Sequence, residues 1–424
     1  MHGRWRMSKR ERKWSRREFL KTAGAAGVGS VLGSMNPLVK AAGKSHPEAS
    51  DQLLVPTRPF GKTGVNVSIL GLGGSGSLPY SQLLYRQAIK MGVTYWDTAE
   101  TYGRGKSEMG IGEYFAKHPD DRIKVFLVTK SHSRDLEGLS RSLDRSLERM
   151  NTSHIDLYFA HGLRGIEELR PFDEFRGWVD KKKSEGKIRF FGFSTHSFME
   201  SCMMEAAELG WIDGIMMSYN YRLMHTDEMK RAVDACVKAG IGLTAMKTQA
   251  VPSWGIFGTV GEESEATSKL TQRFLNKGFT PEQARLKAVW QNTHIASICS
   301  EMDNMNMLMD NAAAALDRTE LSSQDMRLLE QHAHETASTY CAGCAHICES
   351  AVEGHVPISD VMRCLMYHRG YGDGEQARSL FNKISKETRS LLTSRDYSVE
   401  ELRCPQGMPI GRLMREAVGL NIDN

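Results

Sequence analysis

Eight short apolar runs rich in β-forming residues recur along the chain from Pro59 onward. Segments with helical periodicity separate them; Leu139, Leu143 and Leu147, for example, lie four residues apart and would share one helix face. The runs are residues 65–73, 94–99, 125–130, 155–161, 188–194, 214–220, 242–247 and 296–300. Repeated strand–helix units of this number predict an α/β fold, a parallel (β/α)8 TIM barrel. A doubly wound open sheet is the alternative.

The spacing of these runs also predicts the domain organisation. Residues 229–238 have helical periodicity, and Gly240 is placed to end that helix as a C-cap. Residues 249–293 exceed what one helix needs, which predicts a lid-like or partly helical insertion. We expect a head at residues 1–42, a polar linker at 43–57, the barrel at 58–320, and a small, mainly helical, cysteine-rich domain at 321–424.

Positive charge is concentrated in the head. Residues 1–41 hold ten Lys and Arg against Glu11 and Glu18, whereas the whole chain has a formal charge of only +4. The remainder is therefore mildly acidic and offers no electrostatic basis for binding nucleic acid. We expect no nucleic-acid partner.

The head has the composition of an export signal. Residues 15–21 read Ser-Arg-Arg-Glu-Phe-Leu-Lys, and a weakly apolar run rich in small residues leads to Ala41 and Ala42. This resembles a twin-arginine signal cleaved after one of these alanines. An uncleaved membrane anchor is the alternative, although the Gly and Ser content makes a poor membrane-spanning helix. We expect the twin-arginine translocase to export the folded, cofactor-loaded chain to the periplasm or cell envelope.

Ionisable residues lie where three of the predicted strands end. Asp97 is in the second run, Lys130 ends the third and His161 ends the fourth, while Tyr102 follows in a Gly-rich turn. One strand-terminal Asp or His is often only structural. Because active sites of such barrels lie at the C-terminal ends of the strands, the four together predict a catalytic group.

The surrounding motifs resemble the aldo-keto reductase family over residues 58–318. Residues 58–64 read Arg-Pro-Phe-Gly-Lys-Thr-Gly, residues 96–103 read Trp-Asp-Thr-Ala-Glu-Thr-Tyr-Gly, and Val-Thr-Lys at 128–130 and Asp-Leu-Tyr-Phe-Ala-His at 156–161 follow. The resemblance implies an oxidoreductase that interconverts a carbonyl and an alcohol by hydride transfer. Its partner would be a small-molecule carbonyl or alcohol substrate.

The resemblance also assigns roles to the four residues. Tyr102 would donate the proton to the carbonyl oxygen, and Lys130 would lower the pKa of this phenol from its usual value near 10. Asp97 would fix Lys130, and His161 would orient the substrate carbonyl. The other interpretation is a degenerate barrel that binds a substrate or senses redox state without turnover.

The nucleotide-binding positions depart from the family pattern around the nicotinamide. The family holds the carboxamide of NAD(P) with a Ser-Asn pair after the fifth strand and a Gln on the sixth. Ser194, Thr195 and Met216 stand at these positions here, so one amide is replaced by a shorter hydroxyl and the other by a thioether.

The positions expected to bind the 2′-phosphate of NADP also depart from the family pattern. Asn311 matches an Asn near the adenine, and counting back from it places Glu301, Met302 and Met307 where NADP-using members have basic and hydroxyl groups. A carboxylate there would repel a phosphate, so we expect NADP to be disfavoured. Either the site favours NAD or another cofactor, or it no longer binds a soluble nucleotide tightly.

Four of the eight cysteines form a pattern in the tail. Cys341, Cys344 and Cys348 are spaced C-x2-C-x3-C, and Cys404 is followed by Pro405. Three cysteines on one loop with a distant Cys-Pro are typical of ferredoxin-like clusters, and the region resembles the ferredoxin-like tails of some aldo-keto reductases. We expect one 4Fe-4S cluster and an electron-transfer partner. A four-thiolate zinc site and disulfides are the alternatives.

The other cysteines are expected to be buried thiols: Cys202, Cys236, Cys299 and Cys364. A c-type haem is excluded, because Ala345 stands where that motif needs histidine after the second cysteine.

Overall fold

The computed structural model describes residues 53–75, 82–250, 265–351 and 356–419. These residues belong to one compact unit, 52–424. The predicted export signal and its membrane-anchor alternative fall outside the described residues. Within the described ranges, no helix has both the length and the apolar character needed to cross a membrane.

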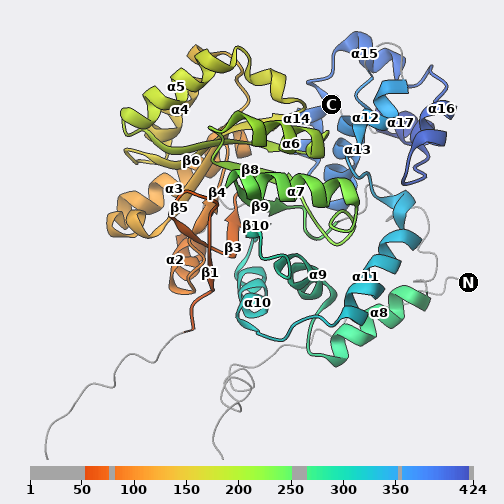
Figure 1. The fold of residues 1–424 in the computed structure, drawn as a ribbon, viewed down its shortest axis with the longest axis horizontal. Helices are drawn as coiled ribbons and strands as arrows, with labels where there is room; N and C mark the ends of the chain where they lie inside the picture. The colour runs from red at the N-terminus through yellow and green to blue at the C-terminus, as the bar shows by residue number, and fades with distance from the viewer. Residues whose placement is uncertain (1–52, 76–81, 251–264, 352–355, 420–424) are drawn as a thin grey trace, which may run out of the picture. The chain divides into compact units, whose positions relative to one another are not determined.

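Eight parallel strands close into a barrel, which confirms the predicted (β/α)8 architecture (Figure 1). The last strand pairs in parallel with the first, so the open-sheet alternative is wrong. The strands are β3 (Leu70–Gly73), β4 (Tyr95–Asp97), β5 (Phe126–Ser131), β6 (Ile155–Leu163), β7 (Ile188–Thr195), β8 (Gly214–Ser218), β9 (Gly242–Met246) and β10 (Ile295–Glu301).

The first predicted run, residues 65–73, is divided between two elements. Its first half is β2 (Asn66–Ser68), which pairs antiparallel with β1 (Thr57–Pro59). This hairpin inserts the fully buried Phe60 into the barrel, where a Cβ on Gly214 or Gly242 would lie within 2.8 Å of the ring. One end of the barrel is thus closed by packing, and the polar residues lie at the other end.

Helices cover the outside of the barrel. They are α2 (Gln82–Lys90), α3 (Lys106–Lys117), α4 (Leu136–Arg149), α5 (Phe172–Ser184), α6 (Met199–Leu209), α7 (Asp227–Ala239), α9 (Pro281–Trp290) and α10 (Met305–Leu316). Gly240 caps α7 with a φ of 72°, as predicted. The insertion at 249–293 includes α8 (Glu265–Asn276), which packs against α9 and against α11 of the tail.

The tail is mainly helical, as predicted, and has its own apolar core. It contains α11 (Ser323–Glu335), α12 (Ala345–Cys348), α13 (Ile358–Leu365), the π-helical turn η7 (Met366–Gly370), α14 (Gly374–Phe381), α15 (Lys386–Leu391), α16 (Ser398–Arg403) and α17 (Ile410–Gly419). Tyr340 and Tyr367 of the tail contact Asn220 and Lys247, which follow β8 and β9. The tail therefore lies against the end of the barrel that carries the predicted catalytic residues.

Candidate active site

A buried ion pair forms the base of the site. Lys130 Nζ lies 2.6 Å from Asp97 Oδ2 and also donates to the backbone carbonyl of Thr98 at 2.8 Å. The side chains of Lys130 and Asp97 are 1% and 3% exposed. The pair comes from β5 and β4, neighbouring strands in register, so two strand ends bring the charges together.

Tyr102 and His161 lie beside this pair. Tyr102 begins the 3-10 turn η2 (Tyr102–Gly105), and its ring centroid is 4.9 Å from Lys130 Nζ. The imidazole of His161, at the end region of β6, meets the Tyr102 ring edge-on with 5.8 Å between centroids. The structure thus brings the four predicted catalytic residues together.

The pKa of Tyr102 moves opposite to the predicted direction. Burial raises it well above 10, and the negative charge of Asp97 raises it further. The net shift is upward although Lys130 lies beside the ring, because burial dominates and Asp97 pairs with the lysine at 2.6 Å. Tyr102 is consequently a neutral phenol that can donate a proton.

His161 is a neutral imidazole in this environment. Burial lowers its pKa well below 6.5, and the neighbouring His132 and Lys130 lower it further. Its ring stacks on that of His132 with 4.1 Å between centroids, and its Nδ1 has no hydrogen-bond partner in the described part of the chain. A neutral ring with one free nitrogen can accept or donate a single hydrogen bond to a substrate oxygen.

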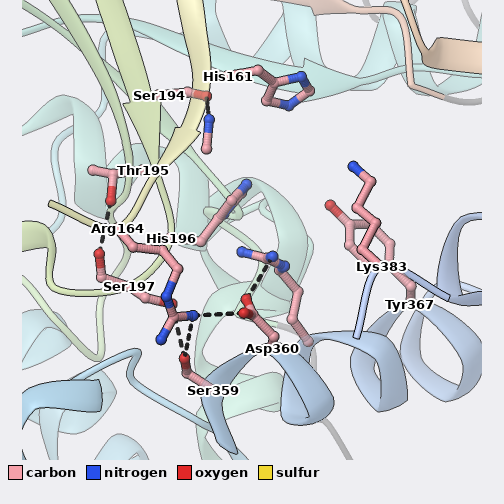
Figure 2. Close-up of polar contacts among 12 residues, drawn as sticks. His161, Arg164, Ser194, Thr195, His196, Ser197, Ser359, Asp360, Tyr367 and Lys383 are labelled. Atoms are coloured by element: carbon pink, nitrogen blue, oxygen red, sulfur yellow. Dashed lines mark hydrogen bonds and ion pairs between the residues drawn. The ribbon is translucent and has the colours of Figure 1, made fainter. Parts of the chain in front are cut away.

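The tail adds residues to the site that sequence analysis missed. Tyr367 Oη lies 2.9 Å from Lys247 Nζ, and the same lysine lies 4.3 Å from the Tyr367 ring centroid. Figure 2 shows Tyr367 and Lys383 of the tail on the same side of the site as His161. Lys247 follows β9 directly, so it had the strand-end signal that marked Lys130, whereas Tyr367 had no comparable signal.

The hydroxyls expected to bind a nicotinamide are engaged within the protein. Ser194 Oγ accepts the backbone N–H of Gly162 at 2.9 Å, and Thr195 Oγ1 donates to the carbonyl of Ser197 at 2.9 Å. Met216 is 2% exposed and packs with Phe60 inside the barrel. These side chains do not form a carboxamide cradle.

The phosphate side is also a poor fit. Asn311 donates to Ser300 Oγ at 3.1 Å, Met302 is fully buried and Met307 is exposed. Burial and the nearby Asp303 raise the pKa of Glu301 to about 6, so at neutral pH it is still largely a carboxylate. The residues present therefore do not fit a nicotinamide nucleotide held in the expected way.

The four patterned cysteines line one cavity of about 360 Å³ in the tail: Cys341, Cys344, Cys348 and Cys404. Apolar side chains such as Ile358 and Met408 form the rest of its wall. Burial raises the pKa of the Cys344 and Cys348 thiols to about 12. Three thiols on one loop and a fourth from a distant loop are the kind of donor set that an iron–sulfur cluster takes.

The arrangement bears on the two alternatives to a cluster. All eight cysteines lie within the described residues and are free thiols, so the structure contains no disulfide among them. Among the same residues, no three His, Cys, Asp or Glu side chains converge closely enough to hold a single metal ion. Cys202, Cys236 and Cys364 are buried as predicted, while Cys299 is half-buried near Asp97.

Comparisons with known proteins concern the barrel as a whole. The model of the aldo/keto reductase family matches residues 69–334, more than half of the chain. Members of that family typically use NAD(P)H. Among curated proteins, the uncharacterized oxidoreductase YrpG of Bacillus subtilis is 28% identical over 239 residues, which is 50% of this chain and 72% of that protein.

Two further relatives extend the comparison. The L-galactose dehydrogenase of Arabidopsis thaliana is 23% identical over 64% of this chain and 91% of its own length. The aldo-keto reductase yakc [NADP(+)] of Schizosaccharomyces pombe is 28% identical, but the match covers 39% of this chain and only 52% of that protein.

Solved structures show the same fold. A thermostable aldo-keto reductase, Tm1743, superposes with a TM-score of 0.53 at 27% identity, covering 65% of this chain and 99% of its own. An aldo-keto reductase of Bacillus halodurans in its holo form gives a TM-score of 0.55 at 20% identity, with 65% and 96% covered.

Proposed function

The chain belongs to the aldo-keto reductase family, a family of oxidoreductases, and from this membership we propose that it interconverts a carbonyl and an alcohol on a small molecule. The observation that carries the proposal is the buried Asp97–Lys130 pair, 2.6 Å long, beside the ring of Tyr102. His161, edge-on to the same ring, completes the group.

Tyr102 is the acid of the proposed reaction. When hydride, or two electrons and a proton, reaches the carbonyl carbon, charge develops on the oxygen, and the neutral phenol supplies the second proton there. Lys130 then stabilises the phenolate that remains, with Asp97 holding the lysine in place. His161 orients the carbonyl through its single hydrogen bond. The nucleotide positions do not fit a nicotinamide, and NADP is disfavoured by the carboxylate of Glu301.

The tail is proposed to hold one 4Fe-4S cluster through Cys341, Cys344, Cys348 and Cys404. When bound, such a cluster exchanges electrons one at a time with a partner. The observation that supports this assignment is that these four thiols line one cavity, and apolar side chains form the rest of its wall. The protein's contribution is to shield this cavity and set its surroundings.

The cluster assignment predicts a measurable metal content. Anaerobically purified protein is expected to be brown with about four irons and four sulfides per chain, and Cys348→Ala to lose both. Cys236→Ala is the matched control, because that thiol is buried in the barrel. A colourless protein with stoichiometric zinc would contradict the assignment.

Export to the periplasm or cell envelope is proposed from residues 1–42 alone. The twin-arginine translocase would be the transient partner, and the Arg16-Arg17 pair its recognition element. Replacing both with lysine is expected to retain the protein in the cytoplasm, as cell fractionation would measure. Unchanged export would contradict this part of the proposal.

The catalytic proposal is tested by Tyr102→Phe, which removes one hydroxyl and little volume. Turnover is measured on a panel of aldehydes and ketones with reduced viologen or NADH as electron source. We expect Tyr102→Phe to lower turnover at least about 100-fold, the usual contribution of general acid catalysis. Tyr158→Phe is the control, since its buried hydroxyl donates to the backbone carbonyl of Leu139 on the outer helix α4 at 3.4 Å. Turnover within a few-fold of the native value would exclude Tyr102.

A second candidate function has its own support. Engaged hydroxyls on Ser194 and Thr195, together with the buried Met216, favour a barrel that binds a substrate or senses redox state without turnover. The same panel of aldehydes and ketones distinguishes this function from the oxidoreductase. A barrel without turnover should bind carbonyl compounds but convert none of them with either electron source.

A further inference from the structure

A second cavity lies between the barrel and the tail, at the end where the catalytic residues are. The barrel contributes His196, Ser218 and Lys247 to its wall, and the tail contributes Cys341, Arg363 and Met366. Cys341 also lines the cysteine cavity, so the two cavities share a wall.

Lys247 carries a charge that no described carboxylate balances. Its Nζ contacts Tyr367 Oη at 2.9 Å, and no Asp or Glu in the described ranges lies within ion-pair distance. Glu301 after β10 is the acid whose pKa responds to Lys247, but the two form no ion pair. A lysine paired only with a phenol leaves a positive site facing the cavity.

Arg363, across the cavity, is incompletely paired. It donates to Asp360 Oδ1 at 2.8 Å, yet that carboxylate is shared with Arg164 at 2.6 Å. The Arg363 Nε is buried and has no hydrogen-bond partner among the described residues. A buried guanidinium N–H without an acceptor is unfavourable unless a ligand oxygen supplies one.

A further lysine and a histidine lie near this cavity. Lys383 contacts only His132 Nε2, at 3.2 Å, among the described residues. Burial lowers the pKa of His196 well below 6.5, and Arg363 and Lys247 lower it further. The ionisable side chains around this cavity are thus mostly basic, and the carboxylate of Asp360 bonds both Arg363 and Arg164.

The backbone at Lys247 holds the side chain at this position. Its φ is 55°, in the left-handed region that non-glycine residues rarely adopt. The fully buried Asn220 fixes it by donating to the Lys247 carbonyl at 3.1 Å. Strained backbone of this kind is concentrated at functional sites.

We propose that this cavity is an oxyanion-binding subsite that takes the carboxylate of an anionic carbonyl substrate between Lys247 and Arg363. The inference rests on the proposed function, because it places the reacting carbonyl at Tyr102. Tyr367 belongs to the tail, and its hydroxyl lies 2.9 Å from Lys247 Nζ, so the tail places a phenol beside the lysine of this subsite. A lysine and an arginine on opposite walls suit a carboxylate, which accepts from both.

The test compares acids with their neutral esters. Pyruvate, 2-oxobutyrate and 2-oxoglutarate, each against its methyl ester, are titrated calorimetrically into the cluster-loaded protein, with inorganic phosphate as a further probe. We expect at least one acid to bind about tenfold or more tightly than its ester, since hydrogen bonds to charged groups contribute that much. Lys247→Gln and Arg363→Gln should each reduce this ratio toward one.

Two controls define the result. Lys238→Met and Lys117→Met each remove an exposed charge on an outer helix, α7 and α3 respectively, and both should leave the ratio unchanged. No preference for any acid, or a preference that survives both glutamine variants, would overturn the proposal. Binding of phosphate with no acid preferred would also overturn it, in favour of a phosphorylated ligand. Tyr102→Phe should still bind the acid more tightly than its ester. Loss of turnover and loss of the acid preference can therefore be distinguished.

Discussion

Tyr102 illustrates how one neighbour decides the protonation state of another. Lys130 lies close enough to stabilise a phenolate, yet Asp97, 2.6 Å from the ammonium, cancels its charge in the resting protein. Burial then dominates, and the phenol stays protonated. A site arranged in this way is suited to giving a proton to a carbonyl oxygen.

The buried pair yields a stability prediction. Asp97→Asn should lower the free energy of unfolding by about 3–5 kcal/mol, because Lys130 would remain buried without a counter-charge. The double variant Asp97→Asn/Lys130→Met should lose less than the sum of the single variants. Denaturant unfolding measures all three, and Asp180→Asn, in an exposed pair with Arg176, should change by at most about 1 kcal/mol. An additive double variant would contradict mutual stabilisation.

At the scale of elements, the barrel was predictable because its signals are local. Each strand lies within or next to a predicted run, and Asp97, Lys130 and His161 were identified by their place near strand ends. The predicted run at 65–73 divides because the chain forms the β1–β2 hairpin before it enters the barrel at β3. The motif at residues 58–64, followed by Val67 and Ser68, resembles the opening hairpin of the aldo-keto reductase family and so predicted this hairpin, whereas the apolar run itself gave no sign of the division.

The site was predictable only in part, because its other half comes from contacts distant in sequence. Tyr367 reaches Lys247 across 120 residues from a π-helical turn. Its sequence surroundings, Met-Tyr-His-Arg-Gly, give no sign of a barrel contact. The neutral state of Tyr102 was likewise hidden, since it depends on burial that only the assembled site creates.

The loop that carries Cys341 and Cys344 yields a testable prediction at the scale of elements. Gly343 has a φ of 79°, and a Cβ there would lie 2.3 Å from the carbonyl oxygen of His196 on the barrel. Gly343→Ala should therefore displace the loop that carries Cys341 and Cys344 and lower the iron content per chain. Gly186→Ala has a similar φ of 69° but open space around its Cβ, so it should keep its iron. Equal iron content in both variants would contradict this account.

At the scale of the whole described unit, several hydrogen bonds attach the tail to the barrel. The backbone carbonyl of Gly343 accepts from Phe198 N–H at 3.1 Å, and Ser197 and Ser359 hydroxyls meet at 3.0 Å. Tyr340 and Tyr367 add contacts to residues that follow β8 and β9. A tail bonded to several strand ends positions both its cysteines and its cations relative to Tyr102.

Arg164 follows β6, and we expect the attachment of the tail to the barrel to depend most strongly on this residue. Its guanidinium is bonded to Asp360 at 2.6 Å and to Glu349, both in the tail, and lies 5.3 Å from the Phe198 ring centroid (Figure 2). The two carboxylates are 22% and 12% exposed, so they are screened less than surface pairs. Removing the arginine leaves both without this partner.

Arg164→Ala should therefore destabilise the attachment of the tail by about 2–3 kcal/mol, the range for hydrogen bonds to charged groups in partly buried sites. Limited proteolysis measures the effect: cleavage between residues 320 and 345 should become faster, while cleavage within the barrel should not. Arg176→Ala removes an arginine whose ion pair with Asp180 is exposed, and it should behave like the native protein. Equal proteolysis of the two variants would mean that apolar packing and the tyrosine contacts suffice to hold the tail on the barrel.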